Sequence, residues 1–157
     1  MKTRRLSGLL LGLGIALAIL IAAQQVQAAL GESADSVAAD RKALSAALGV
    51  TTISAGYTIH ELRSETRTVR EYVSPQGLVF GITWTGLTHP DLTPLLGSYT
   101  DDYQKGLGQT RRQPGRRHVQ VKTDRVVVEK WGHMRNLQGR AYAPALIPPG
   151  VSLDEIK

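Results

Sequence analysis

The four histidines are the side chains best able to transfer protons or bind a metal near neutral pH: His60, His89, His118 and His133. No two of them stand at the i, i+2 spacing on a strand or the i, i+4 spacing on a helix that would suit paired metal ligands. The chain has no cysteine, which excludes disulfide scaffolds, thiol enzymes, iron–sulfur proteins and lipidated N-terminal cysteines. We therefore predict no metal and no cofactor.

Sequence motifs for nucleophilic and phosphate chemistry are also missing. The chain contains no G-x-S-x-G motif, no phosphate-binding loop and no dinucleotide fingerprint. Asp101 and Asp102 are adjacent carboxylates, but neighbouring residues on a helix do not face each other. These absences favour a protein without catalytic activity.

Four side chains of the last predicted hairpin form one candidate binding site: His133, Arg135, Arg140 and Tyr142. A turn over residues 136–139 would set Met134 opposite Tyr142 and Arg135 opposite Ala141. An arginine there could hold a carboxylate or a phosphate through two parallel hydrogen bonds. The alternative is an exposed hairpin in which an arginine packs against an aromatic ring.

A basic loop over residues 109–117 forms the second candidate site. It contains four arginines within seven positions: Arg111, Arg112, Arg116 and Arg117. Outside the cytoplasm, such a patch would meet lipid head groups, lipopolysaccharide, acidic glycans or an acidic protein surface. The alternative is a solvated loop that only keeps the protein soluble.

Residues 1–28 have the pattern of a secretory signal peptide. Three basic residues precede an uncharged apolar run over residues 9–23, and a Val-Gln-Ala tripeptide ends at Ala28. An uncleaved anchor is the alternative, but the run is shorter than the roughly 20 residues of a spanning helix. We predict cleavage after Ala28, a single domain over residues 29–157, and no membrane span after cleavage.

The charge of the chain changes when this segment is removed. The 157 residues include 19 basic and 13 acidic residues, for a net charge of +6. Three of the basic residues and none of the acidic ones lie in residues 1–28, so the remainder has a charge of +3. That excess is too small to indicate nucleic-acid binding. We predict a periplasmic or secreted protein.

Two helices and six strands are predicted from the remaining residues. Helices are expected over residues 33–48, with Gly49 after the end, and over residues 91–105, with Asp91 as the N-cap and Gly106 and Gly108 at the end. Strands are expected over residues 57–62, 66–73, 78–85, 118–122, 125–135 and 140–147. The resulting order, α-βββ-α-βββ, is typical of an α+β domain with a single antiparallel sheet of about six strands and two helices.

The turn Ser74-Pro75-Gln76-Gly77 fixes the register of the second and third strands. A type I turn with a glycine bulge sets Val73 opposite Val79 and Tyr72 opposite Phe80. The alternative, a two-residue loop, would shift the register by one and pair Val73 with Leu78. One buried face would then carry five apolar side chains: Tyr72, Leu78, Phe80, Ile82 and Trp84.

Several of these segments, in this order, resemble a family of exported proteobacterial proteins with a domain of unknown function. The segments are Arg70-Glu71-Tyr72-Val73; Pro75, Gly77, Val79-Phe80 and Trp84; Pro90-Asp91-Leu92; Leu95-Leu96-Gly97-Ser98-Tyr99; Gly132-His133-Met134-Arg135; and Gly139-Arg140-Ala141-Tyr142. The resemblance spans nearly all of residues 29–157. It implies export and one compact domain, and it assigns no activity and no catalytic residue.

The sequence thus favours an exported, non-catalytic binding module of the cell envelope, whose partner is an anionic component or another protein. The alternative is a small periplasmic enzyme with a site around His133, Arg135 and Arg140, joined by His60 or Glu71. A third reading is a structural envelope protein that associates with itself through a sheet edge.

Overall fold

The computed structural model describes residues 30–34, 41–42, 44–110 and 117–157. These residues form an α+β domain with one antiparallel sheet, as predicted, but the sheet has seven strands instead of six. The strands are β1 (Ala47–Ser54), β2 (Tyr57–Arg63), β3 (Arg67–Val73), β4 (Val79–Gly86), β5 (His118–Lys122), β6 (Val127–His133) and β7 (Asn136–Tyr142). Their spatial order is β1-β2-β3-β4-β7-β6-β5, so β4 and β7 join the two halves.

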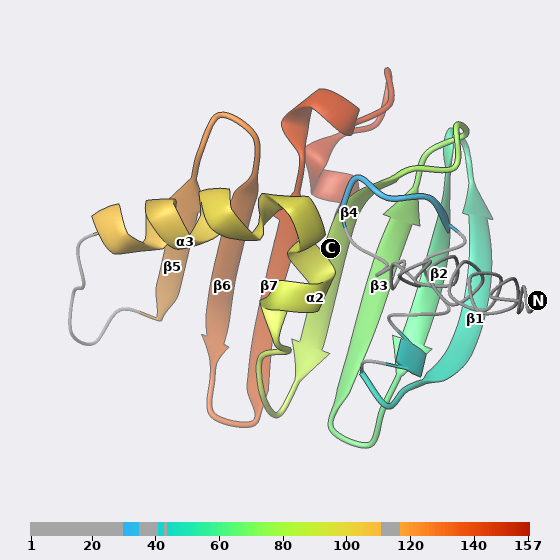
Figure 1. Ribbon diagram of the computed structural model, residues 1–157. Helices are drawn as coiled ribbons and strands as arrows, with labels where there is room; N and C mark the ends of the chain where they lie inside the picture. The colour runs from blue at the N-terminus through green and yellow to red at the C-terminus, as the bar shows by residue number, and fades with distance from the viewer. Residues whose placement is uncertain (1–29, 35–40, 43, 111–116) are drawn as a thin grey trace, which may run out of the picture.

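Two helices, α2 (Leu92–Leu96) and α3 (Thr100–Gln109), lie across β4, β7, β6 and β5 on one face of the sheet (Figure 1). A 3-10 turn, η2 (Gly97–Tyr99), connects them. Asp91 caps α2 as predicted, because its Oδ1 accepts a hydrogen bond from the Thr93 N–H at 2.9 Å. The predicted end at Gly106 is wrong. A Cβ there would lie 2.7 Å from Val121, so this glycine allows α3 to approach β5 closely.

The helix predicted over residues 33–48 is corrected at both ends. Ser33, at the predicted start, forms an isolated β-bridge with Leu78. The main chain of residues 30–34 follows the start of β4, with the Gly31 N–H donating to the Val79 carbonyl at 2.7 Å. Residues 35–40 and 43, in the middle of the predicted helix, lie outside the described residues.

The end of that predicted helix is the additional strand. Gly49 lies within β1 instead of following a helix, and Ser45, with a φ of 48°, stands in a turn just before it. The sequence that follows, Val50 to Ile53, consists only of β-branched residues, which favour an extended chain. Residues 44–48 are therefore not helical, in contrast to the prediction.

A β-bulge in the β3–β4 hairpin changes the predicted faces. Val73 pairs with Val79 as predicted, but Tyr72 pairs with Gly81, not with Phe80. The extra residue turns the Phe80 side chain to the face opposite Ile82. The prediction of one continuous buried face from Leu78 to Trp84 is therefore wrong, and both faces of β4 are buried.

The β6–β7 hairpin also turns earlier than predicted. His133 pairs with Asn136, so the turn consists of Met134 and Arg135, and Arg135 adopts a φ of 70°. The strand that returns ends at Tyr142, before the predicted end at residue 147.

The register of that hairpin differs accordingly. Tyr142 pairs with Val127 instead of Met134, and Ala141 pairs with Val128 instead of Arg135. Gly139 lies inside β7 and forms no turn.

Gly139 has a packing role instead. A Cβ at this position would lie 2.2 Å from Cζ2 of Trp84, because the indole packs directly against the main chain of Gly139. Only a glycine admits the indole at this point in the sheet.

Each face of the sheet has its own apolar cluster. On the helix face, strand residues pack against the two helices and Leu30; the cluster includes Val69, Ile82, Trp84, Val128, Leu92, Leu95, Leu96 and Tyr103. On the opposite face, which we call the C-terminal face, the cluster consists of Tyr57, Tyr72, Phe80, Val127, Tyr142 and Ile156. The sheet is therefore the middle layer of the domain.

The chain after β7 covers part of the C-terminal face. It contains two 3-10 turns, η3 (Pro144–Leu146) and η4 (Leu153–Glu155), and the side chain of Ser152 caps the second turn. Ile156 is fully buried, and Gly81 beneath it leaves room for its side chain. We call residues 144–157 the C-terminal segment.

Leu30 belongs to the core on the helix face. Leu30 is fully buried, and its N–H donates to the Leu95 carbonyl at 2.9 Å. Among the residues that the structure describes, no helix is long and apolar enough to cross a membrane.

Candidate functional site

The C-terminal face of the sheet is layered in three rows that run across the strands. An apolar row contains Tyr72, Gly81, Tyr142 and Val127. The next, which we call the charged row, contains Glu61, Arg70, Thr83, Arg140 and Glu129. The third, the Thr–Trp row, contains Thr68, Thr85, Gln138 and Trp131. Because alternate residues of a strand share a face, the three rows lie two positions apart along every strand.

The charged row is nearly symmetrical about Thr83. On one side, Arg70 donates from Nε to Oε2 of Glu61 at 2.9 Å, and Arg63 bonds the other oxygen of the same carboxylate. The hydrogen bond from Arg70, aided by Arg63 and opposed by burial, lowers the pKa of Glu61. Glu61 is therefore held as a buried carboxylate with two cationic partners.

On the other side of Thr83, Arg140 donates from Nε to Oε2 of Glu129. The second carboxylate oxygen of Glu129 accepts a hydrogen bond from the Gln120 amide at 2.6 Å. The Arg140 guanidinium also lies over the Tyr142 ring, 5.7 Å from its centre. Burial, together with the nearby charge of Glu129, raises the pKa of Tyr142.

Both arginines of the charged row also bind the C-terminal segment. Nη1 of Arg140 donates to the Leu153 carbonyl at 3.0 Å and lies 3.4 Å from the Ile156 carbonyl. Nη1 of Arg70 lies 3.5 Å from the Lys157 main-chain oxygen, which also accepts a 2.7 Å hydrogen bond from the Tyr72 hydroxyl. The row thus joins the sheet to the segment that covers it.

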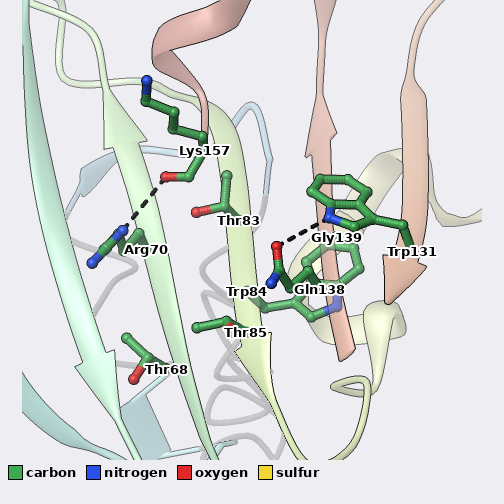
Figure 2. A pocket seen from close by; sticks show the side chains of 9 residues that line it. All are labelled: Thr68, Arg70, Thr83, Trp84, Thr85, Trp131, Gln138, Gly139 and Lys157. Carbon is green, nitrogen blue, oxygen red and sulfur yellow. Dashed lines mark hydrogen bonds between the residues drawn. The ribbon is translucent and has the colours of Figure 1, made fainter. Parts of the chain in front are cut away.

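A depression of about 260 Å³ opens between the charged row and the Thr–Trp row (Figure 2). We call it the Arg70 depression; its lining consists of Thr68, Arg70, Thr83, Trp84, Thr85, Trp131, Gln138, Gly139 and Lys157. Arg70 and Trp131 stand at opposite ends, and Thr83 lies between them (Figure 2). The lining is rich in hydroxyl and amide groups and has one guanidinium and one accessible indole.

A second depression, of about 290 Å³, lies on the other side of Arg70 and Lys157. Glu61, Glu155 and Tyr72 are among the residues that line it. Arg70 and Lys157 line both depressions, but in the second they are accompanied by two carboxylates, whereas the lining of the Arg70 depression includes no carboxylate side chain. The Arg70 depression is therefore the more favourable of the two for an anion.

The structure separates the residues of the predicted hairpin site. His133 and Arg135 are exposed at the tip of the β6–β7 hairpin, whereas Arg140 is half-buried in the charged row. Arg140 pairs with Glu129 across the β6–β7 ladder. Glu129 and His133 are four residues apart on β6, so Arg140 lies roughly 13 Å from His133 along the strand direction. Tyr142 is buried still farther from the tip, in the apolar row.

The other residues of the alternative enzyme site lie elsewhere. His60 and Glu71 are paired neighbours on β2 and β3, and Glu71 is fully buried on the helix face, whereas Arg140 lies on the C-terminal face. Burial lowers the pKa of His60. Within the described ranges, no three His, Asp or Glu side chains gather in a way that could hold a metal ion.

Most of the predicted basic loop lies outside the described residues. Arg111, Arg112 and Arg116 lie outside the described residues, and Arg117 is exposed directly before β5. The loop stays a prediction.

Sequence reasoning missed Arg70, Thr83 and Trp131 as site residues. A usable signal was the repeated Arg-x-Tyr pattern at Arg70 and Arg140, each two residues before a tyrosine. In two strands that flank a third, this pattern places both arginines on one row and both tyrosines on the next.

One comparison with known proteins identifies a family for this chain. A family model described as "Protein of unknown function (DUF2844)" matches residues 26–156. No curated protein and no solved structure matches the chain.

Proposed function

The chain belongs to this family of proteins of unknown function, and we propose that it is an exported, non-catalytic module of the cell envelope that binds an anionic ligand in the Arg70 depression. The match at residues 26–156 begins close to the predicted cleavage site after Ala28. Leu30, two residues after Ala28, is a core residue, so residues directly after the predicted cleavage site belong to the domain.

Arg70 is the residue on which the ligand proposal chiefly depends. Its side chain is 45% exposed although Nε is bonded to Glu61, so the guanidinium is fixed in direction and still reachable from solvent. An oriented arginine beside neutral hydrogen-bonding groups suits a carboxylate or a phosphate.

The lining of the depression also supports binding without catalysis. Its side chains are threonines, an arginine, a lysine, a glutamine and two tryptophans, none of which ordinarily gains or loses a proton near neutral pH. A general acid or base would require such a group.

Export can be tested on the full chain produced in a two-membrane bacterium. We expect mass spectrometry of the envelope fraction to find a polypeptide that begins at Ala29. Intact Met1 on protein recovered from the cytosol would contradict the proposal.

Anion binding can be tested with the exported protein and three probes: phosphatidylglycerol vesicles, lipopolysaccharide and an acidic polysaccharide. We expect at least one of them to bind, with affinity that falls as salt rises, and Arg70→Met to lower it about tenfold. The matched control is Arg63→Met, which removes the other arginine bonded to Glu61 but leaves the lining unchanged. Binding that Arg70→Met leaves intact, while replacement of the loop arginines by serine abolishes it, would move the site to the basic loop.

A further inference from the structure

The two ends of the Arg70 depression call for different chemistry in one ligand. Arg70 at one end attracts an anionic group, and Trp131 at the other presents an aromatic surface (Figure 2). Between them lie the hydroxyls of Thr83 and Thr85 and the amide of Gln138. The ligand must therefore combine a negative charge, an apolar surface and several hydrogen-bonding groups.

The indole of Trp131 is held in a fixed direction. Its Nε1 donates to Oε1 of Gln138 at 3.0 Å, and the Gln138 amide nitrogen in turn donates to Asn136 at 3.0 Å. The His118 ring lies beside it, with ring centres 6.5 Å apart. A fixed, partly exposed indole offers an electron-rich face to the slightly positive C–H groups of a flat ring such as a pyranose.

The threonines favour a ligand that carries hydroxyls. A threonine hydroxyl both donates and accepts, so it matches sugar hydroxyls, which do the same. An ionised phosphate or carboxylate only accepts hydrogen bonds, so it would use the threonine hydroxyls as donors and leave them unused as acceptors. A bare anion or a lipid head group therefore fits Arg70 but leaves the Thr–Trp row unused.

The shape of the depression is compatible with one sugar unit of a longer chain. Its volume of about 260 Å³ is just below the roughly 300–1,000 Å³ of most small-molecule sites. Because the depression is open to solvent, neighbouring units of a polymer can continue out of it.

Resting on the proposed function, we infer that the Arg70 depression binds a hexuronate unit of an acidic glycan. The sugar ring lies against Trp131, its hydroxyls meet Thr83, Thr85 and Gln138, and its carboxylate meets the guanidinium of Arg70.

The test uses trisaccharides of galacturonate and of mannuronate as probes, with neutral galactotriose as the uncharged comparison. Isothermal titration of the exported protein should show binding of an acidic trisaccharide about tenfold or more tighter than galactotriose. Arg70→Met and Trp131→Leu should each weaken it about tenfold, and Arg63→Met should leave it unchanged.

Fluorescence supplies an independent readout, because the chain has two tryptophans and Trp84 is only 3% exposed. The acidic trisaccharide should change the emission of the parent protein but not that of Trp131→Leu. This variant's circular dichroism and unfolding midpoint, compared with the parent's, separate lost binding from lost folding.

The outcomes distinguish the two proposals. Binding of phosphatidylglycerol vesicles or lipopolysaccharide through Arg70, without either acidic trisaccharide, would overturn the glycan and keep the anion-binding function. Equal affinity for galactotriose would overturn the carboxylate contact with Arg70. If neither the acidic trisaccharides nor any of the three earlier probes binds, both proposals fail.

Discussion

The two halves of the charged row use the same pair of residue types in different surroundings. Arg70 and Arg140 each bind a buried glutamate through Nε and a main-chain oxygen of the C-terminal segment through Nη1. The Arg70 side chain is 45% exposed, whereas that of Arg140 is 23% exposed. The carboxylate partner of Arg70 has a second arginine, Arg63, and the partner of Arg140 has only a neutral amide beside it.

This difference indicates what each pair does. Removing one cation from Glu61 leaves another in place, so Arg70 is free to be used for a ligand with little cost in stability. Removing Arg140 leaves the buried charge of Glu129 without a bonded cation among the described residues, and loss of one partner of a buried ion pair is among the most destabilising single changes. A symmetrical row therefore combines a structural half with a half suited to binding.

The largest expected effect tests the structural half. We expect Arg140→Met to lower the free energy of unfolding by about 4 kcal/mol, because Glu129 stays buried without a cation. The matched change Arg70→Met should cost about 1 kcal/mol or less, since its pair is more exposed and Glu61 keeps Arg63. Urea unfolding at neutral pH measures both. Equal losses for the two variants would abolish the distinction between the halves.

An intermediate effect tests the segment that both arginines hold. We expect Ile156→Ala to lower the free energy of unfolding by about 3 kcal/mol, because it empties a fully buried site above Gly81. Leu153→Ala, at a more exposed position of the same segment, is the control and should cost much less. Thermal unfolding measures both, and a fully stable Ile156→Ala protein would contradict the packing described above.

The smallest expected effect is the pH dependence of the stability that the ion pairs of Glu61 contribute. The pKa of Glu61 is lowered in the folded protein from its ordinary value of 4.5. Its ionised form therefore stabilises the fold above that pH, and this contribution is lost as the pH falls through the lower, folded pKa. The parent should be more stable than Glu61→Gln at neutral pH, and this advantage should shrink as the pH falls below 4.5.

The control for this measurement is Glu65→Gln, which removes an exposed carboxylate of the β2–β3 turn. A stability difference between parent and Glu61→Gln that stays constant from neutral to acid pH would show that the ion pairs of Glu61 do not contribute.

Much of the sheet was predictable because its signals are local. The turn at residues 74–77 fixed the Val73–Val79 pair, and the apolar alternation identified β3 and β4. The bulge at Phe80 was not predictable, since one extra residue reverses the face of a side chain without changing the composition. β1 was missed because its first residues continue an alanine-rich pattern that suits a helix equally well.

The candidate site was less predictable than the fold because it is made across strands. His133 and Arg135 are close in sequence to Arg140, but a two-residue turn puts them at the tip while Arg140 lies in the charged row. Arg70 and Trp131 are 61 positions apart in the sequence. They line the same depression because β4 pairs with β7 and so joins the two halves of the sheet. Spacing along one strand does not contain that information.

The position of Lys157 has a practical consequence. Its main-chain oxygen is bound by Tyr72, and the residue borders both depressions (Figure 2). A bulky group attached to the side chain of this residue would lie at the edge of the Arg70 depression and compete with whatever enters. For the same reason, a dye attached there would sense occupancy of the depression.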